Sequence, residues 1–204
     1  SNNALTATNG TFTGNIIIPN AGNIGSASDT DAIAISSGGI ANFTQTPTIN
    51  SLNISNTPAF EAEIDGSGSR QEIGANNTNV KVQFDTEVFD TDSAYDNSTN
   101  YRFTPQVAGK YFVYAYLGVN PESNSNLNDC YCLLKKNGSG FAYGHNNFLS
   151  NPIRYNTIAA QGVATLNGSS DYVECFVQAG DASGTADVDT GFYSRFGAYR
   201  LLGA

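Results

Sequence analysis

The sequence contains no methionine, no tryptophan and only one histidine, His145. Because it has no initiator methionine, we expect its 204 residues to be part of a longer protein. Any catalytic triad or multi-histidine metal site would rest on His145 alone. The Gly and Asn residues around His145 predict an exposed loop. We therefore expect this chain not to be an enzyme.

Charge is scarce and mostly of one sign. Charged residues make up 13% of the chain, against about 25% in a typical soluble protein. The formal net charge is −9, which repels phosphate backbones and argues against a nucleic-acid partner. No run of about 18 apolar residues is present, so we expect no membrane insertion.

The three cysteines, Cys130, Cys132 and Cys175, lie in alternating apolar runs without metal-ligand spacing. Cys130 and Cys132 would share one face of a strand, too far apart for a comfortable disulfide. This pattern predicts buried free thiols. A bridge from Cys175 to one of the other two remains an alternative if their strands are neighbours.

Residues 1–56 differ from the rest of the chain. Their only charges are Asp29 and Asp31, and their only large apolar anchors are Phe12 and Phe43. Ordering a residue costs about 1–2 kcal/mol, more than one copy of this segment could recover by burial. We therefore expect a fibre shaft or trimerisation segment, whose short strands become ordered by wrapping around two further copies. A flexible linker is the alternative. The expected short strands are 15–19, 32–35 and 52–54.

Residues 57–204 predict a separate head domain with longer strands richer in aromatic residues. No helical period extends over eleven residues, so the predicted class is an all-β sandwich. The expected strands are 80–85, 111–117, 129–135, 155–166, 171–178 and much of 192–202. The expected turns are Asn137-Gly138, Asn167-Gly168 and Ala179-Gly180-Asp181.

The stretch 111–117 is apolar on both strand faces, whereas a sandwich strand normally turns a polar face to water. A neighbouring subunit is the expected cover for the second face. The alternative is that the tyrosine hydroxyls reach water at the edge of the strand. The residues expected to divide between the subunit core and the trimer axis are Tyr111, Phe112, Tyr114, Tyr116, Phe196 and Tyr199.

Several motifs of the head domain occur in a characteristic order: Phe84-Asp85, Tyr95-Asp96, Phe103, Pro105, Gly109, Tyr111-Phe112, Lys136-Asn137-Gly138 and Ser194-Arg195-Phe196-Gly197. Over residues 58–202 this order resembles the C1q domain family, the ten-strand jelly rolls related to tumour necrosis factor. The resemblance implies a homotrimer whose variable loops contact ligands. The collagen repeat that often precedes such domains in animals is missing.

The N-terminal segment resembles repeat segments of bacteriophage tail fibres, on motifs such as Gly22-Asn23-Ile24-Gly25-Ser26 and Ser37-Gly38-Gly39-Ile40. Together the two resemblances imply a tail fibre or similar appendage, located on the extracellular virion, with a C1q-like tip. Other virion proteins would bind through the missing N-terminal part.

Three loops rich in Asn and Ser are candidates for receptor recognition: 121–128, 140–155 and 181–191. They combine aromatic stacking surface with hydrogen-bond donors, which suits a host-surface glycan or protein. The candidate receptor-binding residues are Tyr143, His145, Asn146, Asn147, Arg154 and Tyr155.

The aspartates Asp181, Asp187 and Asp189 form the richest oxygen cluster. Calcium takes six to eight oxygen ligands, which three carboxylates and nearby carbonyls could supply. A flexible acidic turn without metal is the alternative, and in that case no cofactor is expected.

These observations predict a homotrimeric virion fibre that adheres to a host receptor through its C1q-like head. Three alternatives remain open at this stage. They are a purely structural capsid or neck fibre, a secreted C1q-like lectin, and a polysaccharide depolymerase that uses a carboxylate pair.

Overall fold

The computed structural model describes residues 23–24, 32–44, 57–74, 78–121, 126–181 and 185–202. The chain divides into two compact units, Ser1–Asn53 and Ile54–Ala204. Within the described ranges, no helix is long and apolar enough to cross a membrane.

The first unit contains a small antiparallel sheet of β1 (Asn23–Ile24), β2 (Ile33–Ile35) and β3 (Ala41–Phe43). The strand predicted at 32–35 is confirmed by β2. The strands predicted at 15–19 and 52–54, together with Asp29 and Asp31, lie outside the described residues. Ile40 and Phe43 are 65% and 53% exposed in the single chain, so one copy leaves these side chains largely uncovered.

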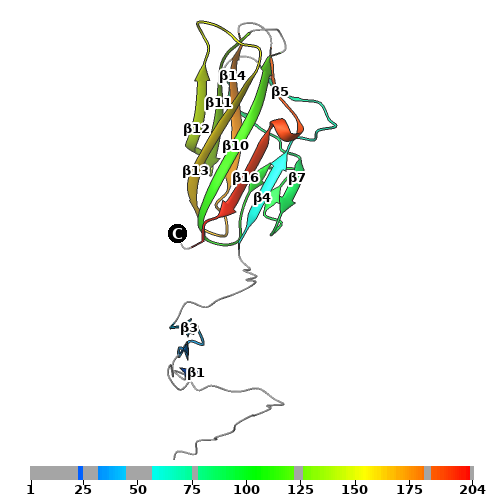
Figure 1. Ribbon diagram of the computed structural model, residues 1–204. Coiled ribbons are helices and arrows are strands. Elements are labelled where there is room, and N and C mark those ends of the chain that lie inside the picture. Colours follow the sequence, from blue (N-terminus) through cyan, green and yellow to red (C-terminus); the bar gives the residue numbers. More distant parts are fainter. Residues whose placement is uncertain are drawn as a thin grey trace, which may run out of the picture. The chain divides into compact units, whose positions relative to one another are not determined.

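The second unit is a sandwich of antiparallel sheets, which confirms the all-β class (Figure 1). Its elements are β4 (Ala59–Glu63), β5 (Gln71–Gly74), β6 (Val80–Lys81), β7 (Thr86–Asp90), β8 (Tyr95–Asp96), β9 (Arg102–Phe103), β10 (Gly109–Pro121), β11 (Leu127–Lys136), β12 (Ser139–Asn147), β13 (Asn156–Leu166), β14 (Val173–Asp181), β15 (Ala186–Val188), the 3-10 turn η1 (Gly191–Tyr193) and β16 (Arg195–Arg200).

One sheet has the order β13-β10-β16-β4-β7, and β15 and β5 continue it beside the far end of β10. The other has the order β12-β11-β14-β9-β8, with β6 also paired to β14. The last strand, β16, lies between β10 and β4, which are far apart in sequence (Figure 1). Such non-consecutive neighbours are typical of a jelly roll.

The core between the sheets follows the period-two alternation of β10. Tyr111, Val113 and Leu117 are fully buried, and so is Phe196 on the neighbouring β16. Phe60 packs against Phe196 with ring centroids 5.0 Å apart and an edge-to-face geometry. Tyr111 and Phe196 therefore belong to the subunit core rather than to its surface.

Two predicted irregular segments are regular strands. Much of the loop expected at 140–155 is β12, and the turn expected at Ala179-Gly180-Asp181 continues β14, where Asp181 lies opposite Leu127. Both predictions were wrong because backbone pairing with β11 compensates for the weak strand preference of Asn, Gly and Asp. Conversely, only Val80–Lys81 of the strand expected at 80–85 is regular, although Val82 and Phe84 are fully buried.

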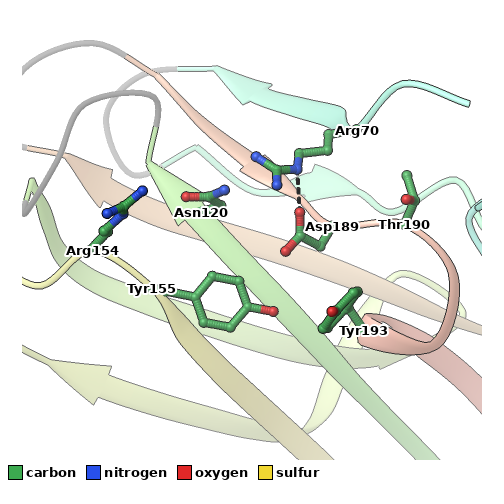
Figure 2. Close-up of a pocket in the computed structure, with 7 residues that line it drawn as sticks. All are labelled: Arg70, Asn120, Arg154, Tyr155, Asp189, Thr190 and Tyr193. Carbon is green, nitrogen blue, oxygen red and sulfur yellow. Dashed lines mark ion pairs between the residues drawn. The ribbon is translucent and has the colours of Figure 1, made fainter.

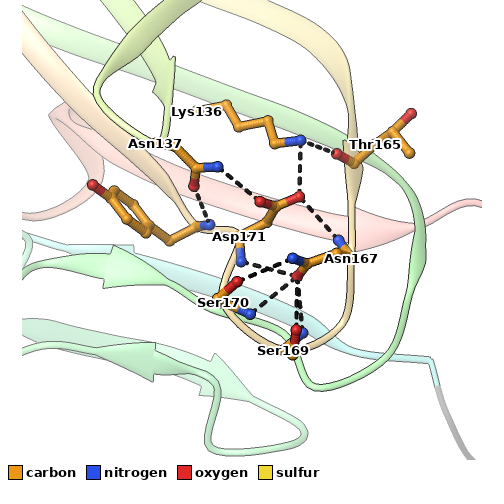
Figure 3. A network of polar contacts seen from close by, with 8 residues as sticks. Lys136, Asn137, Thr165, Asn167, Ser169, Ser170 and Asp171 are labelled. Carbon is orange, nitrogen blue, oxygen red and sulfur yellow. Dashed lines mark hydrogen bonds and ion pairs between the residues drawn. The ribbon is translucent and has the colours of Figure 1, made fainter.

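The hairpin between β11 and β12 turns at Asn137-Gly138, as predicted, with φ values of 50° and 80°. This turn is joined to the 167–172 loop by a polar network (Figure 3). The Asp171 carboxylate accepts from Asn137 Nδ2 at 2.7 Å and from the backbone N–H of Asn167 at 3.1 Å, and it pairs with Lys136 at 2.8 Å. Two loops distant in sequence are thereby held together at one end of the sandwich.

Cys130, Cys132 and Cys175 are all buried free thiols in this structure. Cys132 on β11 and Cys175 on β14 face each other with their sulfur atoms 3.9 Å apart, a contact rather than a bond.

Candidate binding site

The outward face of the β13-β10-β16 sheet carries an apolar patch. In the strand register, Phe112 on β10 lies between Val163 on β13 and Tyr199 on β16. The Phe112 and Tyr199 rings are 5.4 Å apart. Val163 is 51% exposed and Tyr199 46% exposed. We call Phe112, Tyr114, Tyr116, Val163 and Tyr199 the aromatic face.

A polar pocket lies at the end of the same sheet, with a volume of about 370 Å³. Its walls come from the segment before β5, the end of β10, the segments before β13 and after β15, and η1. The lining residues, all drawn in Figure 2, are Arg70, Asn120, Arg154, Tyr155, Asp189, Thr190 and Tyr193.

An ion pair forms one wall of the pocket. The Asp189 carboxylate, in a residue only 6% exposed, pairs with the Arg70 guanidinium. The hydrogen-bond donors of Arg70 favour an Asn120 amide turned by 180° from the orientation drawn in Figure 2, in which its oxygen accepts from Arg70 Nη2 at 3.1 Å. The backbone N–H of Asp189 donates to the carbonyl of Gly118 at 2.8 Å. Arg70 is therefore neutralised and held in place on this wall.

Tyr155 crosses the floor of the pocket, with its hydroxyl directed toward the Asp189 side (Figure 2). Gly118 permits this position, because a Cβ there would lie 2.3 Å from the Tyr155 hydroxyl oxygen. Burial, and then the negative charge of Asp189, raise the pKa of Tyr155. The phenol therefore stays protonated at neutral pH and remains a hydrogen-bond donor.

Arg154 lies across the pocket from the ion pair, on the far side of Asn120 (Figure 2). It is exposed, and it makes no ion pair, hydrogen bond or cation–π contact with any residue that the structure describes. Arg154 thus supplies a positive charge that is not neutralised by any side chain in the described part of the chain.

The six candidate receptor residues separate into two groups. Arg154 and Tyr155 enter the pocket, whereas Tyr143, His145, Asn146 and Asn147 belong to β12.

His145 lies on a strand, which corrects the loop expected there. Its ring stacks on Tyr131 of β11 with centroids 3.8 Å apart, and its Nε2 atom lies 3.8 Å from Asp129 Oδ2. Asn146 is partly buried and faces Asn156 at 3.4 Å, whereas Tyr143 is 71% exposed.

The three aspartates of the predicted calcium cluster are not gathered into one site. In the described parts of the chain, no group of three His, Cys, Asp or Glu side chains is placed to hold a metal ion. Asp189 is engaged by Arg70, Asp187 lies on β15, and Asp181 ends β14. Asp181 belongs to the sheet of β12, β11 and β14, whereas Asp187 belongs to the sheet of β5, β15 and β10, so the three carboxylates do not converge.

The pocket lining is polar. It provides two guanidinium groups, an amide, a carboxylate, a hydroxyl and two phenol rings, all of which can form hydrogen bonds or ion pairs with a polar ligand. Glycoside hydrolysis by the usual mechanism uses two carboxylates on either side of the scissile bond. Among the residues that line the pocket, Asp189 supplies one.

Among the pocket residues, the sequence predicted Arg154 and Tyr155 individually and Thr190 as part of the 181–191 loop, but it did not predict Arg70, Asn120 or Tyr193. Asp189 was singled out, but as a calcium ligand. The signal that marks Arg70 in the sequence is that it is the first basic residue of the chain.

No protein-family model and no curated protein matches the sequence. Among solved structures, murine APRIL at pH 5.0 matches with a TM-score of 0.50 and 10% identity, over 72% of this chain and 100% of that one. The globular domain of zebrafish complement 1qA protein gives 0.48 and 13%, over 71% and 97% of the two chains. The Eiger TNF structure from S. frugiperda gives 0.47 and 14%, over 72% and 95%. The likeness to APRIL shows the fold, and the second unit is a C1q/TNF-like jelly roll.

Proposed function

We propose that this chain is a homotrimeric component of a virion fibre, and that its C1q/TNF-like head adheres to a glycan or protein on the host surface. The observation that carries the proposal is the aromatic face, an apolar patch on the outward side of a sheet whose other side already forms the core.

A second and a third copy of the chain are the proposed cover for this face. Fully burying a side chain such as Val163 is worth about 1.5–3 kcal/mol. Several such residues in each of three subunits would sustain a stable oligomer. The face contains three tyrosines and one phenylalanine, residue types that are enriched at the centres of protein interfaces. A trimer is also what the C1q resemblance implies.

The fibre role is supported by the N-terminal unit. Residues 1–56 contain two charged residues, Asp29 and Asp31, and the sheet of β1, β2 and β3 leaves Ile40 and Phe43 more than half exposed in one chain. Three parallel copies would supply the apolar surface that one copy lacks, as a fibre shaft requires.

The oligomeric part is tested by placing a charge on the face. Val163→Asp should convert the trimer to monomers at micromolar concentration, because a carboxylate would be buried without a partner. Val88→Asp is the matched control. Val88 is 47% exposed and lies on β7, the edge strand at the opposite end of the sheet from β13. Light scattering coupled to size exclusion measures both. A wild-type monomer, or a trimer unaffected by Val163→Asp, would overturn the proposed interface.

The adhesive part is tested by adsorption of the labelled full chain to host cells. Saturable binding that unlabelled protein displaces supports adhesion. Adsorption without saturation would indicate a purely structural fibre and contradict the receptor-binding role.

A further inference from the structure

The charge balance of the pocket points to the kind of ligand it accepts. Arg70 and Asp189 neutralise each other, and the remaining charge in the lining is the cation of Arg154. This positive site is local, because the chain as a whole has a formal net charge of −9. A ligand that fills the pocket would therefore place an anionic group against Arg154, where a guanidinium binds a carboxylate in a bidentate manner.

The size and lining restrict the rest of the ligand. A volume of about 370 Å³ is at the lower end of small-molecule sites. None of the seven lining residues is aliphatic. The Tyr155 and Tyr193 rings offer flat surface, while Asn120 and Thr190 offer groups that bond to hydroxyls. A sugar ring has this combination of a C–H face and hydroxyl rim.

We propose that the pocket binds a sugar acid, with its carboxylate on Arg154, its ring against Tyr155 and Tyr193, and its hydroxyls toward Asn120 and Thr190. The inference rests on the proposed adhesive function and names the receptor chemistry, a carboxylated glycan. A peptide carboxyl terminus that ends in an apolar residue fits less well, because none of the lining residues is aliphatic and its last side chain would lack an apolar subsite.

The test is a saturation-transfer NMR titration of the 204-residue chain. The probes are methyl glucuronide, the methyl glycoside of N-acetylneuraminic acid, neutral methyl glucoside, acetate and a short acidic peptide. At least one of the two acid sugars should bind ten or more times tighter than methyl glucoside and acetate. Equal binding of neutral and acidic sugars, binding of acetate or the peptide as tight as that of the acid sugars, or no binding of either acid sugar would overturn the proposal.

Variants separate the role of Arg154 from general charge. Arg154→Ala should weaken acid-sugar binding at least tenfold, and Arg154→Lys should restore part of it because the charge returns without the planar fork. Lys110→Ala is the matched control: it removes an exposed cation near the opposite end of β10 and should change the Kd less than twofold. An Arg154→Ala variant that binds as tightly as the wild type would contradict the assignment.

The two proposals fail in different ways. If Arg154→Ala still adsorbs to host cells with wild-type saturation, the sugar-acid site is wrong and adhesion stands. If the wild type does not adsorb saturably but binds a free acid sugar through Arg154, the adhesive function is wrong and the site stands.

Discussion

The phenol of Tyr114 on β10 donates a hydrogen bond of 2.6 Å to Oε2 of Glu61 on β4, reaching across β16, which lies between them. The other Glu61 oxygen accepts from Arg195 at 2.7 Å, and Arg195 pairs with Glu63 at 2.6 Å. Burial, and then the hydrogen bond to Glu61, raise the pKa of Tyr114, so the donor stays protonated at neutral pH. Three strands of one sheet are thereby joined on their outward side.

Tyr114→Phe should lower the free energy of unfolding by about 1 kcal/mol, because the Glu61 carboxylate loses a donor in a partly buried place. Tyr116→Phe is the control: the Tyr116 hydroxyl lies on the same face and makes no hydrogen bond with a described residue. Urea unfolding at one fixed protein concentration measures both variants. Equal stability of the two variants would show that the bond to Glu61 contributes nothing.

Gly144→Ala should be strongly destabilising, by about 1–3 kcal/mol or more. Gly144 lies on β12 where that strand meets β13, and a Cβ there would lie 2.0 Å from the carbonyl oxygen of Ala159. Gly140→Ala on the same strand is the matched control, since a Cβ there meets nothing within 4 Å. Thermal unfolding should separate the pair clearly, and similar melting temperatures would rule out the close approach of β12 to β13.

Asp171→Asn should make the melting temperature less dependent on pH under acidic conditions. Hydrogen bonds from Lys136 and Asn137 lower the pKa of Asp171 in the folded protein. A depressed pKa stabilises the fold above the unfolded-state value of about 3.9, and the contribution disappears as the pH falls through the folded-state value. The wild type should therefore lose melting temperature more steeply than Asp171→Asn as the pH falls below about 4.

The control for this profile is Asp92→Asn, because the Asp92 carboxylate accepts no hydrogen bond from a described residue. Its acid profile should follow that of the wild type. Parallel profiles for wild type and Asp171→Asn would mean that the network of Figure 3 does not depend on the charge of Asp171.

The thiols should be unreactive in the folded protein. Burial raises the pKa of Cys130 to about 11 and raises that of Cys175 as well. The thiolate is the reactive form, and all three thiols, Cys132 included, are buried from the reagent. Ellman's reagent at pH 8 should therefore label none of the three cysteines until guanidinium is added, and then all three. Labelling of one cysteine after denaturation would instead reveal a Cys132–Cys175 disulfide.

The order of side chains along 111–117 predicted which residues share each face of β10. The structure confirms the inward face, because Tyr111 and Val113 are fully buried. The turn at Asn137-Gly138 could also be predicted from the sequence, because few residue types other than Asn and Gly tolerate the positive φ that this turn requires. These features are local. A side chain's direction in a strand depends on its own position in the chain, and a turn depends on its own few residues.

The tertiary structure alone decided which strands are neighbours, and hence the pocket. Arg70 and Asp189 are brought together by pairing of β5 with β15, and Asn120 joins them because β15 also pairs with the end of β10. No sequence period encodes such contacts, since each is fixed by long-range backbone pairing that buries a common core. Long-range backbone pairing also explains the polar segments that form strands, because β11 pairs with β12 on one side and with the end of β14 on the other. The sequence determined the class of fold and the two-sided strand, and the order of the strands determined the site.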